Sequence, residues 1–361
     1  MKLMPATPII LIGSAWDRGF QQSLRKPELK RELCLAVKER LDMMRNKLND
    51  PHIKSFLNKQ LNFTKKYSPE SLDEIKGIAE GYGLLSDDLF TYLHLGVIDD
   101  YIGQEDGCSV FAFENTSSGP ILAKNRDYHG VHKKLQQVFL SSDPDWGGRQ
   151  CLFVGSLGSP GAFSSGMNSD GLAIADNRIG WSQPGIGWLR YFLMTKILTD
   201  SGTVEEALNL INSVELVGGG SIVMADKSGN LVSVELGHGR VYVDRGMGGF
   251  VSHTNQYQDP ELAKYATRTQ SDPLSASSLG RLDKINTDPK CHDNTVELRS
   301  VSDLLKSHET ADRALCRHGI DGDSLTISSV IFCCKTQELY FCPSLPCEND
   351  WQVYTLNQKL V

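Results

Sequence analysis

The sequence predicts an α+β fold in which two β-sheets stack between layers of helices. Apolar residues recur at helical spacing through the first hundred residues, and from Cys108 the pattern changes to short strands separated by turns. A pair of helices interrupts the strands, and further helices precede a last strand block. Sheets and helices that alternate in blocks favour this architecture, because each apolar sheet face must be covered by another element.

The N-terminal helices are indicated by spacing and by residues typical of helix starts. A charged run over residues 27–49 carries apolar side chains at helical intervals. Ser68 followed by Pro69 opens a second helix, since proline suits the first helical position. Ser86 opens a third helix. We therefore expect residues 1–107 to form a helical region.

Short apolar runs bounded by turn residues predict the strands. Those of the first block are Cys108–Phe113, Ile121–Lys124, Gln136–Leu140, Leu152–Val154, Ala162–Ser165 and Leu172–Ala175. Two helices follow, Gly187–Thr199 and one opened by a capping box at Thr203–Glu206. A meander is predicted at Ser221–Asp226, Leu231–Leu236 and Val241–Asp244. Helices near Pro273–Ile285 and Ser300–His308 precede the last predicted strands, Thr326–Cys333 and Glu338–Cys342.

Composition and charge exclude several classes of protein. The 361 residues are 40% apolar and 22% charged, which is typical of a globular protein in water. No apolar run approaches the length of a membrane span, and the N-terminus lacks the long apolar segment of a signal peptide. The net charge of −7 provides no basic surface for nucleic acid or an anionic membrane. We expect a cytoplasmic protein that binds neither nucleic acid nor a membrane. The sequence leaves its oligomeric state open.

Nine cysteines are scattered along the chain. An odd number without a signal peptide argues against a disulfide framework. A zinc site is an alternative, with the candidate ligands Cys316, His318, Cys342 and Cys347. Their spacing fits no common zinc motif, and a structural zinc needs four converging ligands. The sequence therefore favours buried, reduced thiols and no metal.

A predicted hairpin places a cysteine beside a polar cluster. Its first strand begins at Cys108 and its second strand ends in a polar run that contains Asp127, so pairing brings that run back toward the thiol. A thiol beside titratable groups at a sheet edge is a hypothetical nucleophile. Gly107 offers little hindrance to attack on its own carbonyl. Cys108 could therefore cut the bond before itself, and its new α-amine could serve as a base.

A small buried side chain is the simpler interpretation of Cys108, because most free cysteines are buried. The hairpin alone favours that interpretation, but motifs elsewhere in the chain reverse it. They are the Asn125-x-Asp127 pair, the Gly-x-Asn-x-x-Gly turn at 166–171, the His253-Thr254-Asn255 triplet, the Ser278-x-x-Arg281 pattern and the Cys316-Arg317 segment. Their order resembles that of the acyl-coenzyme A:6-aminopenicillanate acyltransferase family, which are autoproteolytic acyltransferases and hydrolases of the N-terminal nucleophile superfamily. The resemblance covers nearly the whole chain.

This resemblance implies a fold, a processing event and a set of catalytic residues. The fold would be the αββα sandwich of the superfamily. Residues 1–107 would be a pro-region that becomes an α chain, packed against a catalytic β chain of residues 108–361. Cys108 would be the nucleophile, Asp127 would orient its amine, and Asn255 would donate to the oxyanion. A turn aspartate and a strand-end asparagine are the ordinary alternatives for the last two.

Three further residues are candidates for substrate binding or support. Lys124 lies where bile-salt hydrolase and ceramidase relatives place an arginine. A lysine ammonium is a single point charge and cannot form the two parallel hydrogen bonds of a guanidinium. It could lower the pKa of Cys108 or hold a substrate carboxylate. Asn168 is a weaker second candidate for the oxyanion, with a turn role as its alternative. Arg281 could support the site or bind an anionic substrate, and a solvated helix arginine is its alternative.

The expected function is that of a cofactor-free amidase or acyltransferase. It would act on a small linear amide or an acyl thioester through an acyl-Cys108 intermediate, with hydrolysis as the primary reaction. Residues on the meander and in the loops around Trp181 to Trp188 are expected to line the pocket. Two alternatives stay open: an uncleaved, non-catalytic protein that binds a small ligand or a partner, and a conventional cysteine–histidine hydrolase with His253 as base.

Overall fold

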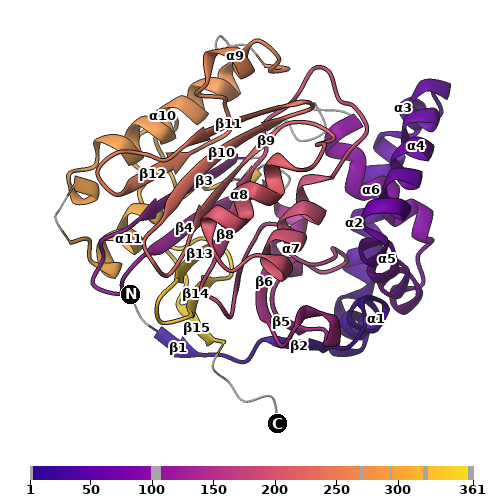
Figure 1. The fold of residues 1–361 in the computed structure, drawn as a ribbon, viewed down its shortest axis with the longest axis horizontal. Coiled ribbons are helices and arrows are strands. Elements are labelled where there is room, and N and C mark those ends of the chain that lie inside the picture. The colour runs from indigo at the N-terminus through magenta and orange to yellow at the C-terminus, as the bar shows by residue number, and fades with distance from the viewer. Residues whose placement is uncertain (1–2, 99–106, 269–271, 293–294, 320–323, 357–361) are drawn as a thin grey trace.

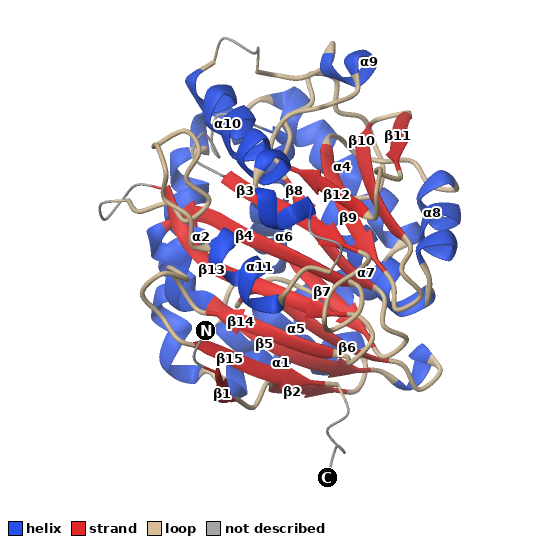
Figure 2. Cartoon of the chain, turned by 90° about the vertical axis from the view of Figure 1, so that its left-hand side faces the viewer, coloured by secondary structure: helices blue, strands red, loops and turns tan. Residues whose placement is uncertain are grey.

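Two β-sheets stack face to face, and helices cover both outer faces. The computed structural model describes residues 3–98, 107–268, 272–292, 295–319 and 324–356. In Figure 1 the layers follow one another across the view, with the helices Pro273–Thr287 and Leu298–Leu305 on the left of the strands and the N-terminal helices on the right. Figure 2 looks onto the strands from the left-hand side of Figure 1. The predicted αββα sandwich is therefore confirmed.

The two sheets differ in size and contain strands from both ends of the chain. The seven-stranded sheet has the order β1 (Leu3–Pro5), β15 (Trp351–Thr355), β14 (Glu338–Cys342), β13 (Ser324–Cys333), β4 (Ile121–His129), β3 (Gly107–Phe113) and β12 (Phe250–His253). The eight-stranded sheet has the order β11 (Arg240–Asp244), β10 (Leu231–Gly237), β9 (Gly220–Ala225), β8 (Ala173–Asn177), β7 (Ser165–Asn168), β6 (Gln150–Ser156), β5 (Gln136–Ser142) and β2 (Ile9–Ile12).

The helices form the two outer layers. On the side of the eight-stranded sheet they are α1 (Ala15–Arg25), α2 (Lys30–Met43), α3 (Arg45–Leu48), α4 (Pro51–Tyr67), α5 (Pro69–Tyr82), α6 (Ser86–Ile98), α7 (Arg190–Asp200) and α8 (Val204–Asn212). The short α9 (Pro260–Ala263) follows β12 in the chain. The next two helices, α10 (Pro273–Thr287) and α11 (Leu298–Leu305), pack against the seven-stranded sheet. The described residues contain four 3₁₀ segments, among them Pro27–Leu29 and Gly130–Leu135.

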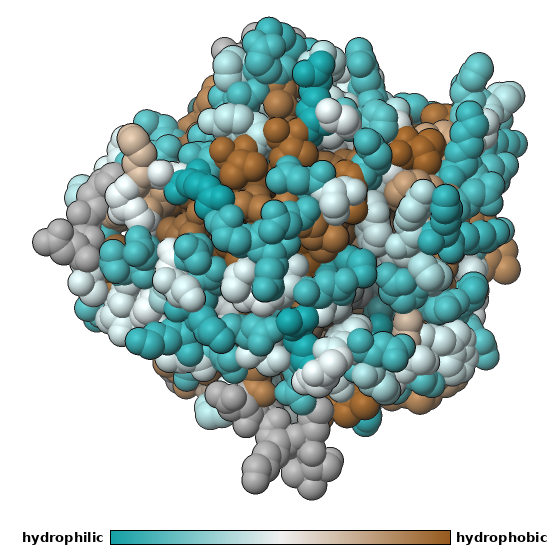
Figure 3. Space-filling view, in the orientation of Figure 1, coloured by the Kyte–Doolittle hydropathy of each residue, from teal (hydrophilic) through white to brown (hydrophobic). Residues whose placement is uncertain are grey.

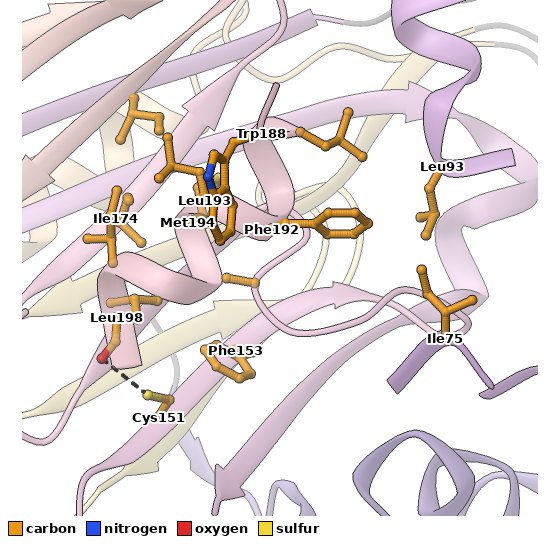
Figure 4. Packing of buried hydrophobic residues seen from close by; sticks show 14 of the residues in the cluster. Ile75, Leu93, Cys151, Phe153, Ile174, Trp188, Phe192, Leu193, Met194 and Leu198 are labelled. Carbon is orange, nitrogen blue, oxygen red and sulfur yellow. Dashed lines mark hydrogen bonds between the residues drawn. The ribbon is translucent and has the colours of Figure 1, made fainter. Parts of the chain in front are cut away.

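Three apolar clusters hold the four layers together. One lies between the sheets and includes Val110 and Leu122. A second packs α10 and α11 against the seven-stranded sheet. The largest packs α2 and α5–α8 against the eight-stranded sheet, and Figure 4 shows α7 side chains such as Phe192 and Leu193 directed into it. Figure 3, in the orientation of Figure 1, shows polar side chains over most of this face of the molecule and a group of apolar side chains near its centre.

The N-terminal region contains two strands that the sequence analysis missed. β1 pairs in parallel with β15, and β2 pairs in parallel with β5. Both strands are only three or four residues long and lie beside prolines, so they carry too little periodicity to be recognised. Residues 1–107 thus supply an edge strand to each sheet as well as the helices.

The predicted hairpin is confirmed and its register is now defined. β3 and β4 are antiparallel, with Gly107 opposite Asp127 and Cys108 opposite Arg126. The polar residues 125–129 continue β4 beyond the predicted end at Lys124. The strand extends because β13 pairs with it along its whole length. The helix-to-strand change before Gly107 falls partly on residues 99–106, outside the described residues.

Strand β7 is displaced from its predicted position. It spans Ser165–Asn168 and not 162–165, because β6 and β8 pair with these later residues. The other predicted strands differ from the observed ones by a few residues at their ends. In the described part of the chain, no helix combines the length and apolarity needed to cross a bilayer.

Candidate active site

The side chain of Cys108 lies on the inner face of β3, between the two sheets. Alternate residues of a strand face opposite sides, so Cys108 shares this face with Val110 and, across the hairpin, with Lys124 and Arg126. The thiol is buried and lines a small cavity. Burial raises the pKa of Cys108, although the charge of Lys124 opposes the rise. The thiol is therefore protonated at neutral pH and needs a base to react.

A buried ion cluster lies beside the thiol. Lys124 Nζ donates to the Asp176 carboxylate at 2.7 Å, to the Asp176 carbonyl at 2.7 Å and to the Ser164 carbonyl at 3.1 Å. Arg190 Nε donates to the other Asp176 oxygen at 2.8 Å. Burial disfavours the Asp176 carboxylate, but the charges of Lys124 and Arg190 outweigh it and lower its pKa. All three hydrogens of the Lys124 ammonium are used, so it is held as a structural charge.

The cavity carries an excess of positive charge. Its charged lining consists of Arg40, Lys124, Arg126, Arg178, Arg190, Asp127 and Asp176. Arg126 donates to Gln136 Oε1 at 2.9 Å, so its guanidinium is held by a pairing within the protein. A cavity with more cations than carboxylates favours a polarised carbonyl or an anionic group over a cation.

The backbone of Cys108 is held by two side chains from distant parts of the sequence. Its N–H donates to Asn255 Oδ1 at 2.8 Å, and its carbonyl accepts from Arg281 Nη1 at 2.6 Å. Arg281 Nη2 also donates to Asn255 Oδ1 at 3.0 Å. Asn255 follows β12, which pairs with β3, and Arg281 lies on α10, which packs on the same sheet. The structure thus brings three of the sequence candidates together.

The orientation of the Asn255 amide is determined by its neighbours. Two donors meet at Oδ1, whereas Nδ2 donates to the Arg178 carbonyl at 2.9 Å. The sequence analysis expected Asn255 to donate to an oxyanion. In the uncleaved chain its oxygen instead holds the nitrogen of Cys108. An amide NH₂ carries two hydrogens, so one donor beyond the Arg178 contact is available for the expected role.

Arg281 is a buried member of the site and not a solvated helix residue. It is 2% exposed and also donates to Ser109 Oγ at 2.9 Å. Burial lowers the pKa of Arg281 to about 10, with Asp127 opposing this effect. The guanidinium remains charged at neutral pH. Its contacts with protein groups agree with a supporting role rather than with binding of an anionic substrate.

Asp127 lies on the outer face of the hairpin, beside Gly107. Its Oδ1 accepts from Thr326 Oγ1 at 2.7 Å, and its Oδ2 lies 3.9 Å from Arg317 Nη1. Among the described residues no donor hydrogen-bonds to this buried Oδ2. Burial raises the pKa of Asp127, opposed chiefly by Arg317 and Arg281. An unsatisfied buried carboxylate oxygen is costly unless a donor reaches it.

Gly107 is tightly enclosed by these charged groups. A Cβ atom at this position would lie 2.8 Å from Asp127 Oδ2 and 2.8 Å from Arg317 Nη1. Any side chain would therefore collide with the pair, which explains why glycine precedes the cysteine. The two faces of the hairpin thus divide the site: the thiol faces the cavity, and the peptide group before it faces Asp127.

Comparison with known proteins identifies the family. A family model described as acyl-coenzyme A:6-aminopenicillanic acid acyl-transferase matches residues 114–346, more than half of the chain. The chain belongs to this family. The matched residues include Asp127, Asn255 and Arg281 but begin after Cys108. A search of curated proteins finds no match.

The chain is also similar to solved structures whose names describe a hydrolase, an amidase and an acylase. They include a mutant conjugated bile acid hydrolase from Clostridium perfringens, at 14% identity and a TM-score of 0.42 over 69% of this chain and 97% of that one. An N-acylethanolamine-hydrolyzing acid amidase ortholog from Caenorhabditis elegans has 14% identity and a TM-score of 0.43, over 63% and 93%. Penicillin V acylase from Agrobacterium tumefaciens has 14% identity and a TM-score of 0.42, over 70% and 87%.

Two of the sequence candidates have structural uses: Asn168 is not among the described residues that line either cavity, and Lys124 lines the first cavity as part of the ion cluster. Asn168 Nδ2 donates to the Leu198 and Ser201 carbonyls, and its Oδ1 accepts from two backbone N–H groups of the following turn. The Asn168 amide thus closes a turn, which is the alternative role that the sequence offered for it. Lys124 lines the cavity, but its saturated ammonium does not suit it to hold a substrate carboxylate.

His253 is not placed to serve as a base for Cys108. Its Nε2 lies 2.8 Å from Glu235 Oε1, and its Nδ1 lies 2.9 Å from Ser221 Oγ and 2.7 Å from the Thr254 carbonyl. Both ring nitrogens are therefore engaged away from the thiol. The cavity has no histidine among the described residues that line it. This geometry removes support from the cysteine–histidine alternative.

A second, larger cavity of about 240 Å³ adjoins the first. The two share Leu93, Gly96, Arg178, Arg190 and Tyr191. The second is lined by apolar side chains of α6 and of the loop after β8, among them Val97, Ile179, Trp181, Pro184 and Leu189. Lining residues were expected on the meander and in the loops around Trp181 to Trp188. Trp181, Ser182 and Pro184 of those loops line the second cavity, whereas the predicted meander strands supply none of the described residues that line either cavity.

Sequence reasoning missed Asp176, Arg190 and Arg317 as members of the site. Asp176 directly follows a strand that was predicted to end at Ala175. An acidic residue at the end of a buried strand was the signal available in the sequence, and the structure places it beside Lys124. Arg317 lies in the Cys316-Arg317 segment, which was one of the motifs behind the family resemblance, but no role was assigned to its side chain. Arg190 lies in a predicted helix, and only the tertiary packing brings it to Asp176.

Proposed function

We propose that the chain is an N-terminal-cysteine amidohydrolase and acyltransferase that forms by self-cleavage between Gly107 and Cys108. The supporting observation is that protein groups hold the backbone on both sides of this bond. Asn255 accepts from the Cys108 N–H, Arg281 donates to the Cys108 carbonyl, and Gly107 is enclosed by Asp127 and Arg317. Membership of the acyl-transferase family supports the same chemistry.

Self-cleavage begins with attack of the Cys108 sulfur on the Gly107 carbonyl carbon. The C–S bond forms and the C–N bond breaks. The proton that the thiol loses is balanced by the proton that the Cys108 nitrogen gains as it becomes an amine. Water then hydrolyses the resulting thioester to a Gly107 carboxylate and a free thiol. Because burial raises the pKa of Cys108, thiolate formation limits this step, and cleavage becomes faster as the pH rises.

The cleaved enzyme uses the new α-amine as its base. An unperturbed α-amine has a pKa near 8, so it can accept the thiol proton when substrate binds. Asn255 Oδ1 already contacts the same nitrogen, and Asp127 Oδ2 supplies a buried acceptor beside it. The thiolate attacks the substrate carbonyl, the leaving amine takes up a proton, and an acyl-Cys108 thioester remains for water to hydrolyse.

The adjoining cavities suggest how a small linear amide would bind. The cationic lining beside Cys108 favours the carbonyl oxygen as negative charge develops on it. The apolar lining around Trp181 and Leu189 suits a nonpolar part of the substrate. The bridging Arg178 lines both cavities.

Hydrolysis is the proposed primary reaction, and acyl transfer is a side activity. Hydrolysis of the acyl-Cys108 thioester needs only water. Acyl transfer needs an amine that binds beside the thioester and keeps water away from it. The test supplies an activated acyl donor with a panel of amines at fixed pH and measures free acid against acylated amine. A product that is mainly acylated amine at modest amine concentration assigns the protein as a transferase instead.

Intact-mass measurement tests the processing event. The purified protein is expected to contain two chains, residues 1–107 and 108–361, and Cys108→Ala is expected to remain one chain without turnover. A single chain in the unaltered protein after prolonged incubation would contradict self-cleavage. That result would favour the uncleaved, non-catalytic binding protein.

A further inference from the structure

Outside the cavity, four metal-binding side chains converge near the surface. They are His308, Cys316, His318 and Cys347, whose ligand atoms all lie within 4.8 Å of one another. The two histidine Nε2 atoms are 3.0 Å apart, and the two sulfurs are 3.5 Å apart. His318 Nε2 lies 3.2 Å from the Cys347 sulfur and 3.9 Å from the Cys316 sulfur.

These four separations, from 3.0 to 3.9 Å, lie within about 0.4 Å of the edges of a tetrahedron around one zinc ion. Zinc binds cysteine sulfur at about 2.3 Å and histidine nitrogen at about 2.0–2.1 Å, so a tetrahedral site sets neighbouring ligand atoms about 3.3–3.8 Å apart. Two sulfurs and two imidazole nitrogens are a common ligand set of structural zinc. We propose that His308, Cys316, His318 and Cys347 bind one zinc ion.

The surroundings of the cluster support this assignment. Zinc-binding histidines usually direct their other ring nitrogen to a carboxylate or carbonyl. His318 Nδ1 lies 3.6 Å from Glu348 Oε1, in such an arrangement. The sulfurs rest on a small apolar cluster that includes Leu325 and Leu345, while both histidines are exposed. A metal ion can therefore reach the cluster from solvent.

The observed ligand set differs from the one considered in the sequence analysis. Cys342 lies apart from the cluster, with its sulfur directed to the Leu345 and Asn349 carbonyls. His308 takes its place, because the chain turns back after α11 and the Cys316 N–H donates to the Ser307 carbonyl. The spacing resembles no zinc motif because the ligands come from three separate segments.

The site would join the loop after α11 to the turn after β14. Between Cys316 and His318 lies Arg317, whose backbone forms hydrogen bonds in both directions with Thr326. The Arg317 guanidinium lies beside Asp127 and Gly107. Zinc would thus hold Arg317 at the cleavage junction. This positioning role rests on the proposed function, whereas the zinc site itself does not.

Metal analysis of the native protein tests the site directly. Protein expressed with added zinc and dialysed is expected to retain about one zinc ion per chain. Cobalt exchanged into the native protein is expected to show the intense visible absorption of a tetrahedral thiolate site. Less than about a tenth of an equivalent of zinc would overturn the proposal, as would a mass that shows a Cys316–Cys347 disulfide in freshly purified protein.

Variants assign the ligands and separate the metal site from processing. Cys316→Ser and Cys347→Ser are expected to lower bound zinc at least tenfold, while Cys342→Ser, a matched buried thiol nearby, retains it. Zinc retained by a double Cys316→Ser/Cys347→Ser variant would overturn the assignment. Arg317→Ala is expected to keep zinc but slow self-cleavage. Loss of zinc from the ligand variants stands even if the native chain never cleaves, so the two proposals fail independently.

Discussion

At the scale of single residues, the site depends on contacts that hold polar atoms in one place. Cys108 is protonated because it is buried, and its backbone is fixed by Asn255 and Arg281. Asp127 keeps one buried oxygen without a hydrogen bond from the described residues. Groups arranged at such a cost indicate a functional requirement, because stability alone would favour an apolar replacement.

Asp127→Asn and Asn255→Ala are expected to slow turnover at least about a hundredfold, the scale of losing one well-placed polar group in comparable enzymes. Their melting temperatures should change much less. Turnover and melting are measured on protein that intact mass shows to be cleaved. Asn168→Ala is the contrasting control, because it should lose stability and retain turnover per folded molecule. Normal turnover in both site variants would leave Asp127 and Asn255 with structural roles.

Asp176→Asn is expected to destabilise the fold by about 3–5 kcal/mol, because Lys124 and Arg190 would remain buried without their counter-charge. Chemical denaturation measures the change. Asp200→Asn, which breaks an exposed pair with Lys196, should cost at most about 1 kcal/mol. Similar losses in the two variants would contradict the argument.

The same pair predicts a pH dependence. Lys124 and Arg190 hold the folded pKa of Asp176 below its ordinary value. A carboxyl with a depressed pKa stabilises the fold above its unfolded pKa of about 3.9 and loses that contribution as the pH falls through the folded value. The stability gap between the native protein and Asp176→Asn should therefore be constant near neutrality and shrink below about pH 4. A gap that widens in acid would contradict this sign.

At the scale of elements, the helix pair α1 and α5 is the closest packing in the molecule's N-terminal region. A Cβ atom on Gly19 would lie 2.2 Å from the Glu74 carbonyl oxygen, and one on Gly77 would lie 2.1 Å from the Trp16 carbonyl oxygen. Glycine at the crossing lets the two backbones touch. From there, Gln22 and Glu74 form hydrogen bonds with residues 158–161, beyond the proposed cleavage site.

Gly77→Ala is expected to cost about 1–3 kcal/mol or more, because the added methyl group meets backbone that cannot rotate away. Gly96→Ala is the matched control on α6. Its added methyl group would approach only the Arg178 side chain, at 3.5 Å. This control should be neutral or gain up to about 1 kcal/mol from helix propensity. Thermal denaturation compares the two, and equal stability would contradict close packing at the crossing.

At the scale of the whole molecule, the segment before the proposed cleavage site is built into the structure of the rest. β1 and β2 extend both sheets, Gln60 bonds to Gly187, and Arg18 pairs with Asp143. Residues 1–107 therefore act as part of the fold and not as a detachable leader.

Cleaved protein is expected to elute as one species in native size-exclusion chromatography and to separate into two chains only under denaturing conditions. The many contacts across the junction give the physical reason, since cleavage removes one covalent bond and none of them. Uncleaved Cys108→Ala should elute at the same volume. Separation of the chains without denaturant would contradict the integrated fold.

The sequence by itself determined the elements whose signal is local. The hairpin at Cys108, the meander and most helices follow from periodicity, turn residues and caps, which act over a few residues. Motif order was sufficient to indicate the family, which the family model then matched. The candidates Cys108, Asn255 and Arg281 were named from that order, and their catalytic roles stay predictions.

Only the tertiary structure decided which distant groups meet. It paired β1 and β2 with strands far along the chain, directed the Asn255 oxygen to Cys108 and assigned Asn168 to a turn. It also brought His308 to the two cysteines and His318 in place of Cys342. Such contacts carry no periodic signal, because they depend on how sheets and loops stack in space and not on spacing along the chain.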